Sequence, residues 1–314
     1  MLRIKVDNWK FRVNSLKKLG QGGEAEIYKL REDVVAKVFL EPDDLQFRDQ
    51  SGLQKAAEVR IEEMQEKIFN FPKGLPAGFV VPNGALIDKK KIVFGYVMPY
   101  IKGTGLEKLT QTDAKLSAEQ ISSILVSLYN LVTEVHSKGV VIGDFNENNI
   151  IVDKDFVSHI IDTDSSQFGP YLCRNFMPHF VAPELVVGER LENESGGTRR
   201  SSKKDPPLLT LLTPHTELTD WYSFLVIAMR LVTWTGPYGG VLDDLDLRER
   251  FIERATVFDR RVTYPANARP LNEVPRPLLE TFFRFFSKGE RFVPNLESVE
   301  SVKTLKTGRA KRQR

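Results

Sequence analysis

Apolar and polar residues alternate along the first part of the chain, in short runs separated by glycine or acidic residues. The runs at 11–20, 24–32 and 33–40 have the period of two that is typical of strands with one buried face. The segment 84–101 is similar and predicts a hairpin with a further strand, whereas apolar residues in 53–71 recur at spacings of three and four, which predicts a helix. We therefore expect the first hundred residues to form a small antiparallel sheet with one helix.

The second part of the chain has mainly helical periodicity. Ser117 and Gln120 fit a capping box, and the apolar stripe that follows predicts a helix ending at Gly139. Two further apolar helices are predicted at 217–234 and 276–294. Two short strands are predicted around 141–152 and 158–164. The pattern as a whole predicts an α+β fold.

Two segments have neither the period of two that is typical of strands nor the helical period. Residues from about 189 to 207 are polar, with glycine, serine and like charges, and predict a mobile insertion. Residues 303–314 carry six basic side chains and no acid, which predicts a disordered tail. We therefore divide the chain into regions 1–101 and 102–302, followed by this tail.

Composition narrows the class of protein. The 314 residues are 41% hydrophobic and 28% charged, as in soluble globular proteins. The longest apolar stretch is interrupted by Arg230 before it reaches the ~18 residues that a membrane span needs, and the N-terminus lacks an apolar signal region. We expect a cytoplasmic protein without a membrane partner. The single Cys173 excludes an internal disulfide and a cysteine metal cluster.

The charge balance argues against nucleic acid as the main ligand. The 45 basic and 42 acidic side chains give a net charge of +3, but without the six basic residues of the tail the remainder is −3. A protein that binds nucleic acid is expected to concentrate positive charge on its folded body. No nucleic-acid partner is therefore expected for the body of this chain.

A glycine-rich hairpin and a buried lysine are the first candidates for chemistry. Glycines at 20, 22 and 23 lie between two predicted strands, where backbone N–H groups could cover a triphosphate. Lys37 lies in the apolar strand that follows and needs an anionic partner if it is buried. Glu58 and Glu62 share one face of the next helix, and the sequence leaves both open as that partner. A loose hairpin and an exposed lysine on an edge strand are the simpler alternatives.

The stretch "VIGDFNENNIIV" places oxygen ligands between two buried runs. Asp144 is followed five residues later by Asn149, and Asp162 comes after the next predicted strand. Asn149 and one of the two aspartates can bind a Mg²⁺ ion that bridges phosphates. The carboxylate of the other aspartate can then orient an attacking hydroxyl and take its proton. We therefore expect this turn to handle a metal ion and a proton.

These motifs occur in an order that resembles the eukaryotic-type protein kinase superfamily, from about Leu19 to Pro294. "GQGGEAEI" resembles the glycine-rich loop, "VVAKVF" the lysine strand, "VMPYI" the hinge and "GDFNENNIIV" the catalytic loop. "IIDTD" takes the D-F-G place, "APE" is unaltered, "TDWYSF" resembles the start of the large buried helix, and Arg291 is placed to pair with Glu184. The patterns "DFN…N" and "D-x-D-S-x-Q" resemble an atypical bacterial Ser/Thr kinase-like branch that often occurs with phosphatases, so a cognate phosphatase is a candidate partner.

The resemblance implies a two-lobed protein-kinase-like fold, with an N-lobe at 1–101 and a C-lobe at 102–302, that uses ATP with Mg²⁺ or Mn²⁺. In the catalytic set the resemblance makes Asp144 the base, Lys37 the lysine that binds phosphates and Glu58 the partner of Lys37. Asn146 also belongs to this set and occupies the place where a lysine is usual. It makes Asn149 and Asp162 metal ligands, with Asp164 as a further acid beside the metal. The residues implied at the nucleotide are Gly20, Gln21, Gly22, Gly23, Ala25, Ile27, Ala36, Lys37, Met98, Pro99, Tyr100 and Ile101.

Departures from the pattern keep other functions open. Ile142 and Gly143 replace the usual His-Arg before the catalytic aspartate, and Asn146 removes a cation from the transferring phosphoryl group. The leading hypothesis is a Mg·ATP-dependent Ser/Thr protein kinase whose substrate is not evident from the sequence. A nucleotide-binding pseudokinase or scaffold is the alternative, and a small-molecule kinase is a third, against which the "APE" and "TDWYSF" segments count.

Overall fold

The computed structural model of the protein describes residues 3–6, 9–12, 16–111, 114–187 and 209–306. Contacts within the chain divide it into two units. The first unit is Met1–Lys102 together with Ile160–Asp164, and the second is Gly103–His159 together with Ser165–Arg314. The insertion predicted at 189–207 and residues 307–314 of the predicted tail lie outside the described residues. Unlike the predicted region 1–101, the first unit includes a short segment from far along the chain.

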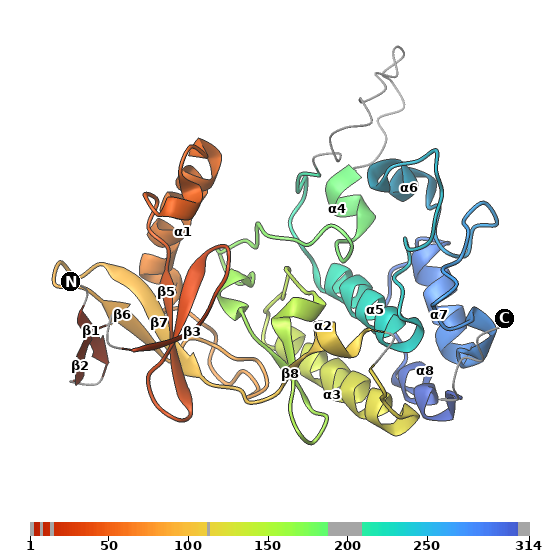
Figure 1. The fold of residues 1–314 in the computed structure, drawn as a ribbon, viewed down its shortest axis with the longest axis horizontal. Helices are drawn as coiled ribbons and strands as arrows, with labels where there is room; N and C mark the ends of the chain where they lie inside the picture. The colour runs from red at the N-terminus through yellow and green to blue at the C-terminus, as the bar shows by residue number, and fades with distance from the viewer. Residues whose placement is uncertain (1–2, 7–8, 13–15, 112–113, 188–208, 307–314) are drawn as a thin grey trace, which may run out of the picture. The chain divides into compact units, whose positions relative to one another are not determined.

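The first unit is built on a five-stranded antiparallel sheet, drawn from red to pale orange in Figure 1. Its strand order is β3-β4-β5-β7-β6, so the last strand of the sequence lies inside the sheet. The strands are β3 (Lys17–Gln21), β4 (Ala25–Lys29), β5 (Val34–Phe39), β6 (Gly84–Ile87) and β7 (Val93–Pro99). β1 (Arg3–Val6) and β2 (Trp9–Arg12) pair as a separate hairpin.

The two faces of this sheet bury different side chains. On one face, Ala36 and Val38 pack with Leu86, Phe94 and Val97. The other face packs against Met64 of helix α1 (Ser51–Lys67) and against Ile68, the residue that follows this helix. The sheet residues on this face are Ala25, Phe39, Val93 and Tyr96. Since side chains alternate along a strand, Lys37 lies on the same face as Phe39.

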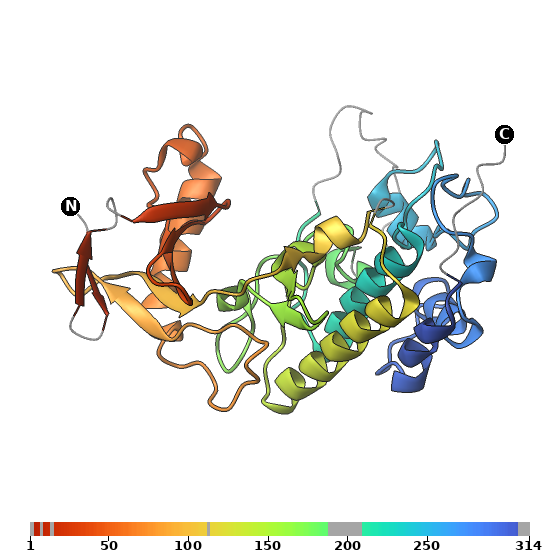
Figure 2. The same ribbon diagram turned by 60° about the horizontal axis from the view of Figure 1, so that its bottom comes forward.

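The second unit is mainly helical. Its two longest helices, α3 (Ala118–Ser137) and α5 (Glu217–Thr233), run side by side in Figures 1 and 2. α5 is buried on almost every side, which explains why its sequence is apolar all round. The other helices are α2 (Leu106–Leu109), α4 (Pro183–Val187), α6 (Leu247–Glu253), α7 (Arg276–Phe286) and α8 (Leu296–Glu300). A small sheet has the order β10-β9-β8, with β8 at Thr104–Gly105, β9 at Ile150–Val152 and β10 at Ser158–Ile160.

The α+β class is confirmed, and so is the capping box, in which Ser117 and Gln120 exchange hydrogen bonds at the start of α3. Several boundaries differ from prediction. The predicted strand 11–20 overlaps the end of β2 and the start of β3, which belong to different sheets, and the predicted helix 276–294 ends at Phe286, three residues before a glycine in the left-handed region. Among the described residues, no helix is both long and apolar enough to cross a membrane.

Candidate active site

In the first unit, the candidate site is centred on Lys37. Its side chain is buried in the middle of β5, and it makes ion pairs with Asp162 and, at 2.7 Å, with Asp164. Tyr96 of β7 donates its hydroxyl to the same Asp164 oxygen at 2.7 Å. Residues more than 120 positions apart in the sequence therefore meet in one buried cluster.

Lys37 and Asp164 stabilise each other's charged forms. Burial works to lower the pKa of Lys37, but the carboxylates of Asp162 and Asp164 outweigh it and hold that pKa well above its ordinary value. Burial works to raise the pKa of Asp164, yet Lys37 and the Tyr96 hydroxyl lower it below its ordinary value. Lys37 and Asp164 are accordingly a charged pair at neutral pH.

The partner of Lys37 differs from the predicted one. Glu58 and Glu62 are exposed on α1, and the ion pairs of Lys37 run to Asp162 and Asp164 instead. A buried ammonium group is stabilised most by carboxylates that are buried with it, where water does not screen their charge. The helical periodicity of the sequence identified the two glutamates but carried no information about the distant segment.

The glycine hairpin joins β3 to β4. Its turn is closed by the Gly22 N–H, which donates to the Ala25 carbonyl at 2.9 Å. Gln46 donates to the Gly23 carbonyl at 2.8 Å, and Arg60 of α1 forms an ion pair with Glu24 at 2.9 Å. A Cβ atom at Gly20 or Gly23 would meet no protein atom within 4 Å. Packing within the chain therefore does not require glycine at these two positions.

The strand register decides which predicted nucleotide residues share a face with Lys37. Ile27 on β4 lies opposite Lys37, Ala25 lies opposite Phe39, and Met98 on β7 lies opposite Val35, so all three belong to the Lys37 face. Ala36 belongs to the other face, where its fully buried side chain packs with Val38 and Leu86. The structure thus does not bring Ala36 to the side of Lys37, as successive residues of a strand point to opposite faces.

The predicted hinge continues from the end of β7. Tyr100 donates its backbone N–H to the Asp33 carbonyl at 2.8 Å. Tyr100 follows the last residue of β7, so this bond continues the pairing of β5 with β7 by one residue.

In the second unit, the candidate catalytic loop lies between Val141 and β9. Asn146 donates its side-chain amide to the Asp144 carboxylate at 2.9 Å, and Asn149 donates its amide to the Asp144 main-chain carbonyl, also at 2.9 Å. The Asn146 side chain also accepts the Asn148 N–H at 3.0 Å and so caps a short 3-10 turn. The two amides fix the Asp144 side chain and main chain relative to Asn149.

A buried aspartate on α5 holds this loop from behind. Asp220 accepts the backbone N–H groups of Ile142 at 2.7 Å and Gly143 at 2.9 Å, and it contacts His136 Nε2 at 2.9 Å. Its side chain is fully buried. The sequence analysis did not single out Asp220, although a single aspartate inside an otherwise apolar helix was a usable signal.

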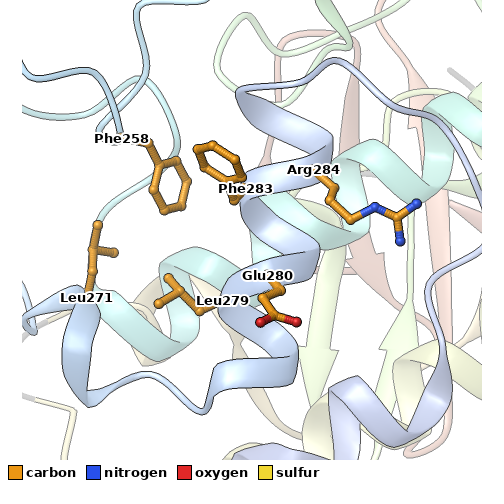
Figure 3. A pocket seen from close by; sticks show the side chains of 6 residues that line it. All are labelled: Phe258, Leu271, Leu279, Glu280, Phe283 and Arg284. Atoms are coloured by element: carbon orange, nitrogen blue, oxygen red, sulfur yellow. The ribbon is translucent and has the colours of Figure 1, made fainter.

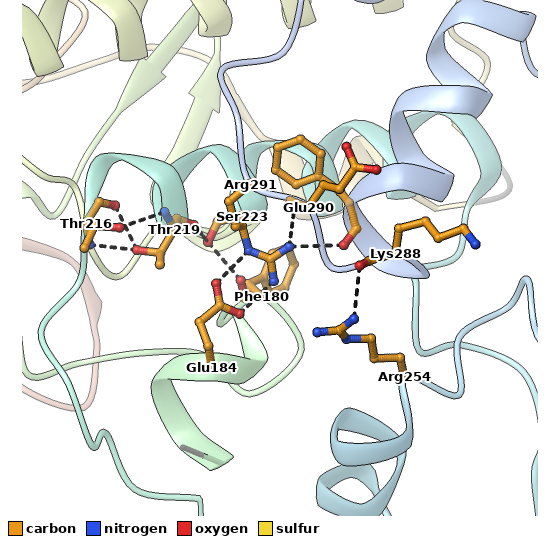
Figure 4. A network of polar contacts seen from close by, with 10 residues as sticks. Phe180, Glu184, Thr216, Thr219, Ser223, Arg254, Lys288, Glu290 and Arg291 are labelled. Carbon is orange, nitrogen blue, oxygen red and sulfur yellow. Dashed lines mark hydrogen bonds and ion pairs between the residues drawn. The ribbon is translucent and has the colours of Figure 1, made fainter. Parts of the chain in front are cut away.

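Two further ion pairs support the second unit. Arg230 of α5 binds both carboxylate oxygens of Glu147 in the catalytic loop, at 2.6 and 2.8 Å, and Thr110 donates to the same carboxylate at 2.9 Å. Arg291 binds both oxygens of Glu184, at 2.6 and 2.7 Å, as Figure 4 shows. The predicted pairing of Arg291 with Glu184 is confirmed, whereas the role of Arg230 was missed.

Gly143 occupies a position that excludes a side chain. Its φ of +79° lies in the left-handed region, and a Cβ atom would lie 2.5 Å from the Cys173 sulfur. Gly139 has a similar φ of +71°, but a Cβ atom there would meet nothing within 4 Å. Replacement of Gly143 by alanine is therefore expected to cost about 1–3 kcal/mol more of unfolding free energy than Gly139→Ala, through steric overlap alone.

Chemical denaturation of the two alanine variants measures this difference. Both substitutions carry the same backbone strain, so the Gly139 variant is the matched control. Equal losses of stability in the two variants would mean that Cys173 does not restrict Gly143.

An apolar pocket of about 420 Å³ lies elsewhere in the second unit, on α7 and the segments beside it (Figure 3). Phe258 and Phe283 meet edge to face across it, with ring centroids 5.7 Å apart. Leu271, Leu279, Glu280 and Arg284 complete its lining. No residue of the catalytic loop lines this pocket.

Comparisons with known proteins agree with the motifs. Residues 28–168 match a family model described as "RIO domain". The chain is 26% identical over 196 residues, or 56% of its length, to "Protein kinase YegI" of Escherichia coli (strain K12). It is 25% identical over 182 residues, or 54% of its length, to the protein of that name from Escherichia coli O157:H7.

These alignments cover 28% and 26% of the two relatives, so the chain spans just over a quarter of the length of the curated relatives that it matches. The RIO match runs from the strand before Lys37 to the segment just after Asp164, and it therefore includes the lysine strand, the catalytic loop and the "IIDTD" segment. Residues 28–168 are thus similar to a RIO domain, and just over half of the chain is similar to two proteins named as protein kinases, in agreement with an atypical kinase-like branch.

Proposed function

We propose that the protein is a Mg²⁺- and ATP-dependent kinase that transfers the γ-phosphoryl group to a serine or threonine hydroxyl of a protein. The observation that supports this most is the ion pair between the buried Lys37 and the partly exposed Asp162. A lysine that binds phosphates and an aspartate that binds metal must lie close together for phosphoryl transfer.

Each residue of the first unit has a specific task in this proposal. Lys37 binds the α and β phosphates, and the backbone of the glycine hairpin covers the triphosphate. The open space at Gly20 and Gly23 supports this, because a ligand can approach the backbone closely where no side chain intervenes. The Pro99 carbonyl and the Ile101 N–H bind the adenine edge, while Ile27 and Met98 contribute apolar contacts on the Lys37 face.

Asn149 and Asp162 would hold the Mg²⁺ ion. Asn149 uses its amide nitrogen on the Asp144 carbonyl, which leaves its side-chain oxygen as the group for a metal. The Asp162 side chain is 41% exposed and that of Asp164 4%, so Asp162 is the more accessible of the two to an ion from solvent. Oxygen ligands of this kind suit a hard divalent cation, which when bound neutralises charge on the phosphates.

Asp144 orients the acceptor hydroxyl and takes its proton. The Asn146 amide, at 2.9 Å, holds the Asp144 carboxylate in one rotamer. Asp220 fixes the backbone just before it, at Ile142 and Gly143. Positioning of this kind is the main contribution that a protein makes to phosphoryl transfer.

The second candidate is a nucleotide-binding pseudokinase, which the same Asn146 contact favours. An amide occupies the place beside Asp144 where a lysine usually stands, so no cation of this loop stabilises the transferring phosphoryl group. A pseudokinase would bind ATP without turnover.

The experiment that separates these functions uses labelled ATP. The protein is incubated with Mg²⁺ or Mn²⁺, and label is scored on protein, on water as free phosphate and on candidate small alcohols. Transfer to protein supports the kinase. Stabilisation by ATP in thermal melting without any transfer supports the pseudokinase. Label on small alcohols alone would contradict both.

A further inference from the structure

We propose that Asp164 and Tyr96 position Lys37, a task that a glutamate of α1 performs in typical protein kinases. This inference rests on the proposed function, in which Lys37 binds phosphates. It assigns two positioning residues and replaces the prediction that Asp164 is a metal ligand.

The strand register places Tyr96 directly opposite Lys37 on the neighbouring strand, with both side chains on one face. The Tyr96 hydroxyl and the Lys37 ammonium group bond to the same oxygen of Asp164, each at 2.7 Å. Tyr96 is fully buried, its ring packs edge to face on Phe39 at 6.0 Å, and the Lys37 nitrogen lies 5.7 Å from the ring centre. A carboxylate fixed by two donors in this way holds the lysine in one position.

The two aspartates differ in accessibility, and this separates their tasks. The Asp164 side chain is 4% exposed and the Asp162 side chain 41%. An ion can reach Asp162, whereas Asp164 is enclosed with its oxygen already shared by Lys37 and Tyr96. Asp164 can therefore keep its bond to the lysine while Asp162 serves the metal.

The polar contacts of α1 point to a different task for that helix. Gln65 bonds both the N–H and the carbonyl of Val93, at 2.8 and 2.9 Å, which fastens the helix to β7. Arg60 bonds Glu24 in the glycine hairpin. Glu58 and Glu62 are exposed, and the ion pairs of Lys37 run to Asp162 and Asp164, so neither of these two glutamates holds Lys37.

The test compares Tyr96→Phe and Asp164→Asn with the double variant Glu58→Gln/Glu62→Gln. The first two variants are expected to raise KM for ATP and to lower kcat, with kcat/KM reduced about tenfold or more. The glutamate variant is expected to stay within about twofold of the wild type. A purely structural effect would lower the fraction of active protein but leave KM for ATP unchanged. If Asp164→Asn does not fold, Tyr96→Phe still tests the inference, because it keeps the buried ring and removes only the hydroxyl.

Acylation of Lys37 by an amine reagent, read by peptide mass spectrometry, provides a readout that needs no kinase activity. Loss of either positioning residue is expected to increase labelling of Lys37 severalfold, and loss of the glutamates is not. The wild type could fail to bind ATP and to transfer phosphate while Lys37 labelling still increases in Tyr96→Phe and Asp164→Asn. In that case the proposed function fails and the positioning inference stands. Unchanged labelling and KM in Tyr96→Phe and Asp164→Asn, or a loss confined to the glutamate variant, would overturn the inference.

Discussion

Asp144→Asn is expected to lower kcat for phosphoryl transfer by about 100-fold or more, which is the usual scale for loss of a general base. The asparagine keeps the size of the side chain, but it cannot accept the proton of the acceptor hydroxyl. Affinity for ATP is expected to be unchanged, because the Asp144 side chain is proposed to contact the acceptor hydroxyl and not the nucleotide or its metal ion. Initial rates with labelled ATP and calorimetric titration of nucleotide measure the two quantities.

Asp155→Asn is the matched control, since Asp155 is exposed in the turn after β9 and contacts Lys154. We expect this control to transfer phosphate at the wild-type rate. Undiminished transfer in Asp144→Asn would remove Asp144 from the role of base, and lost ATP affinity in that variant would indicate damage beyond the loop.

Asp220→Ala is expected to lower the free energy of unfolding by about 3–5 kcal/mol, as is usual when a buried charged partner is removed. The backbone N–H groups of Ile142 and Gly143 and the His136 ring would all lose the acceptor that they share. Buried donors without a partner are costly, and the catalytic loop would no longer be held on α5. Urea denaturation measures the stability, and kcat for transfer is expected to fall in the folded fraction as well.

Glu217→Gln is the control for this experiment, because Glu217 lies on the exposed first turn of the same helix. Its charge near the helix N-terminus is worth only a few tenths of a kcal/mol to about 1 kcal/mol. A similar small loss in Asp220→Ala would show that the catalytic loop does not depend on the Asp220 bonds.

Periodicity and turn chemistry sufficed to predict much of the fold. The capping box at Ser117, the sheet with one helix and the apolar helix that became α5 all follow from local patterns that the structure retains. Boundaries were less accurate, as at the C-terminus of α7, where the predicted helix continued to residue 294 but the structure ends it at Phe286. The alternation of side chains also places Ala36 and Lys37 on opposite faces, which the family resemblance alone did not take into account.

The polar groups of the candidate site were identified by residue type and spacing, but their partners were not. A helical pattern can show that Glu58 and Glu62 share a face, yet it cannot show that Asp164 is buried beside Lys37 after a separation of 127 residues. Asp220 lies in the "TDWYSF" segment, which the sequence analysis used only as a motif, so the task of its carboxylate was missed. In both cases the deciding fact is which charges are buried together, a property of the tertiary structure.

The first unit is not continuous in sequence, and this limits how the protein can be dissected. Residues Ile160–Asp164 contribute the carboxylates that neutralise Lys37, so a fragment that stops at Lys102 would carry an ammonium group in its interior without an anion. Such a fragment should fold poorly by itself. Truncation at the apparent boundary would therefore not yield an autonomous nucleotide-binding module, and residues 1–102 should acquire their native fold only with the later segment present.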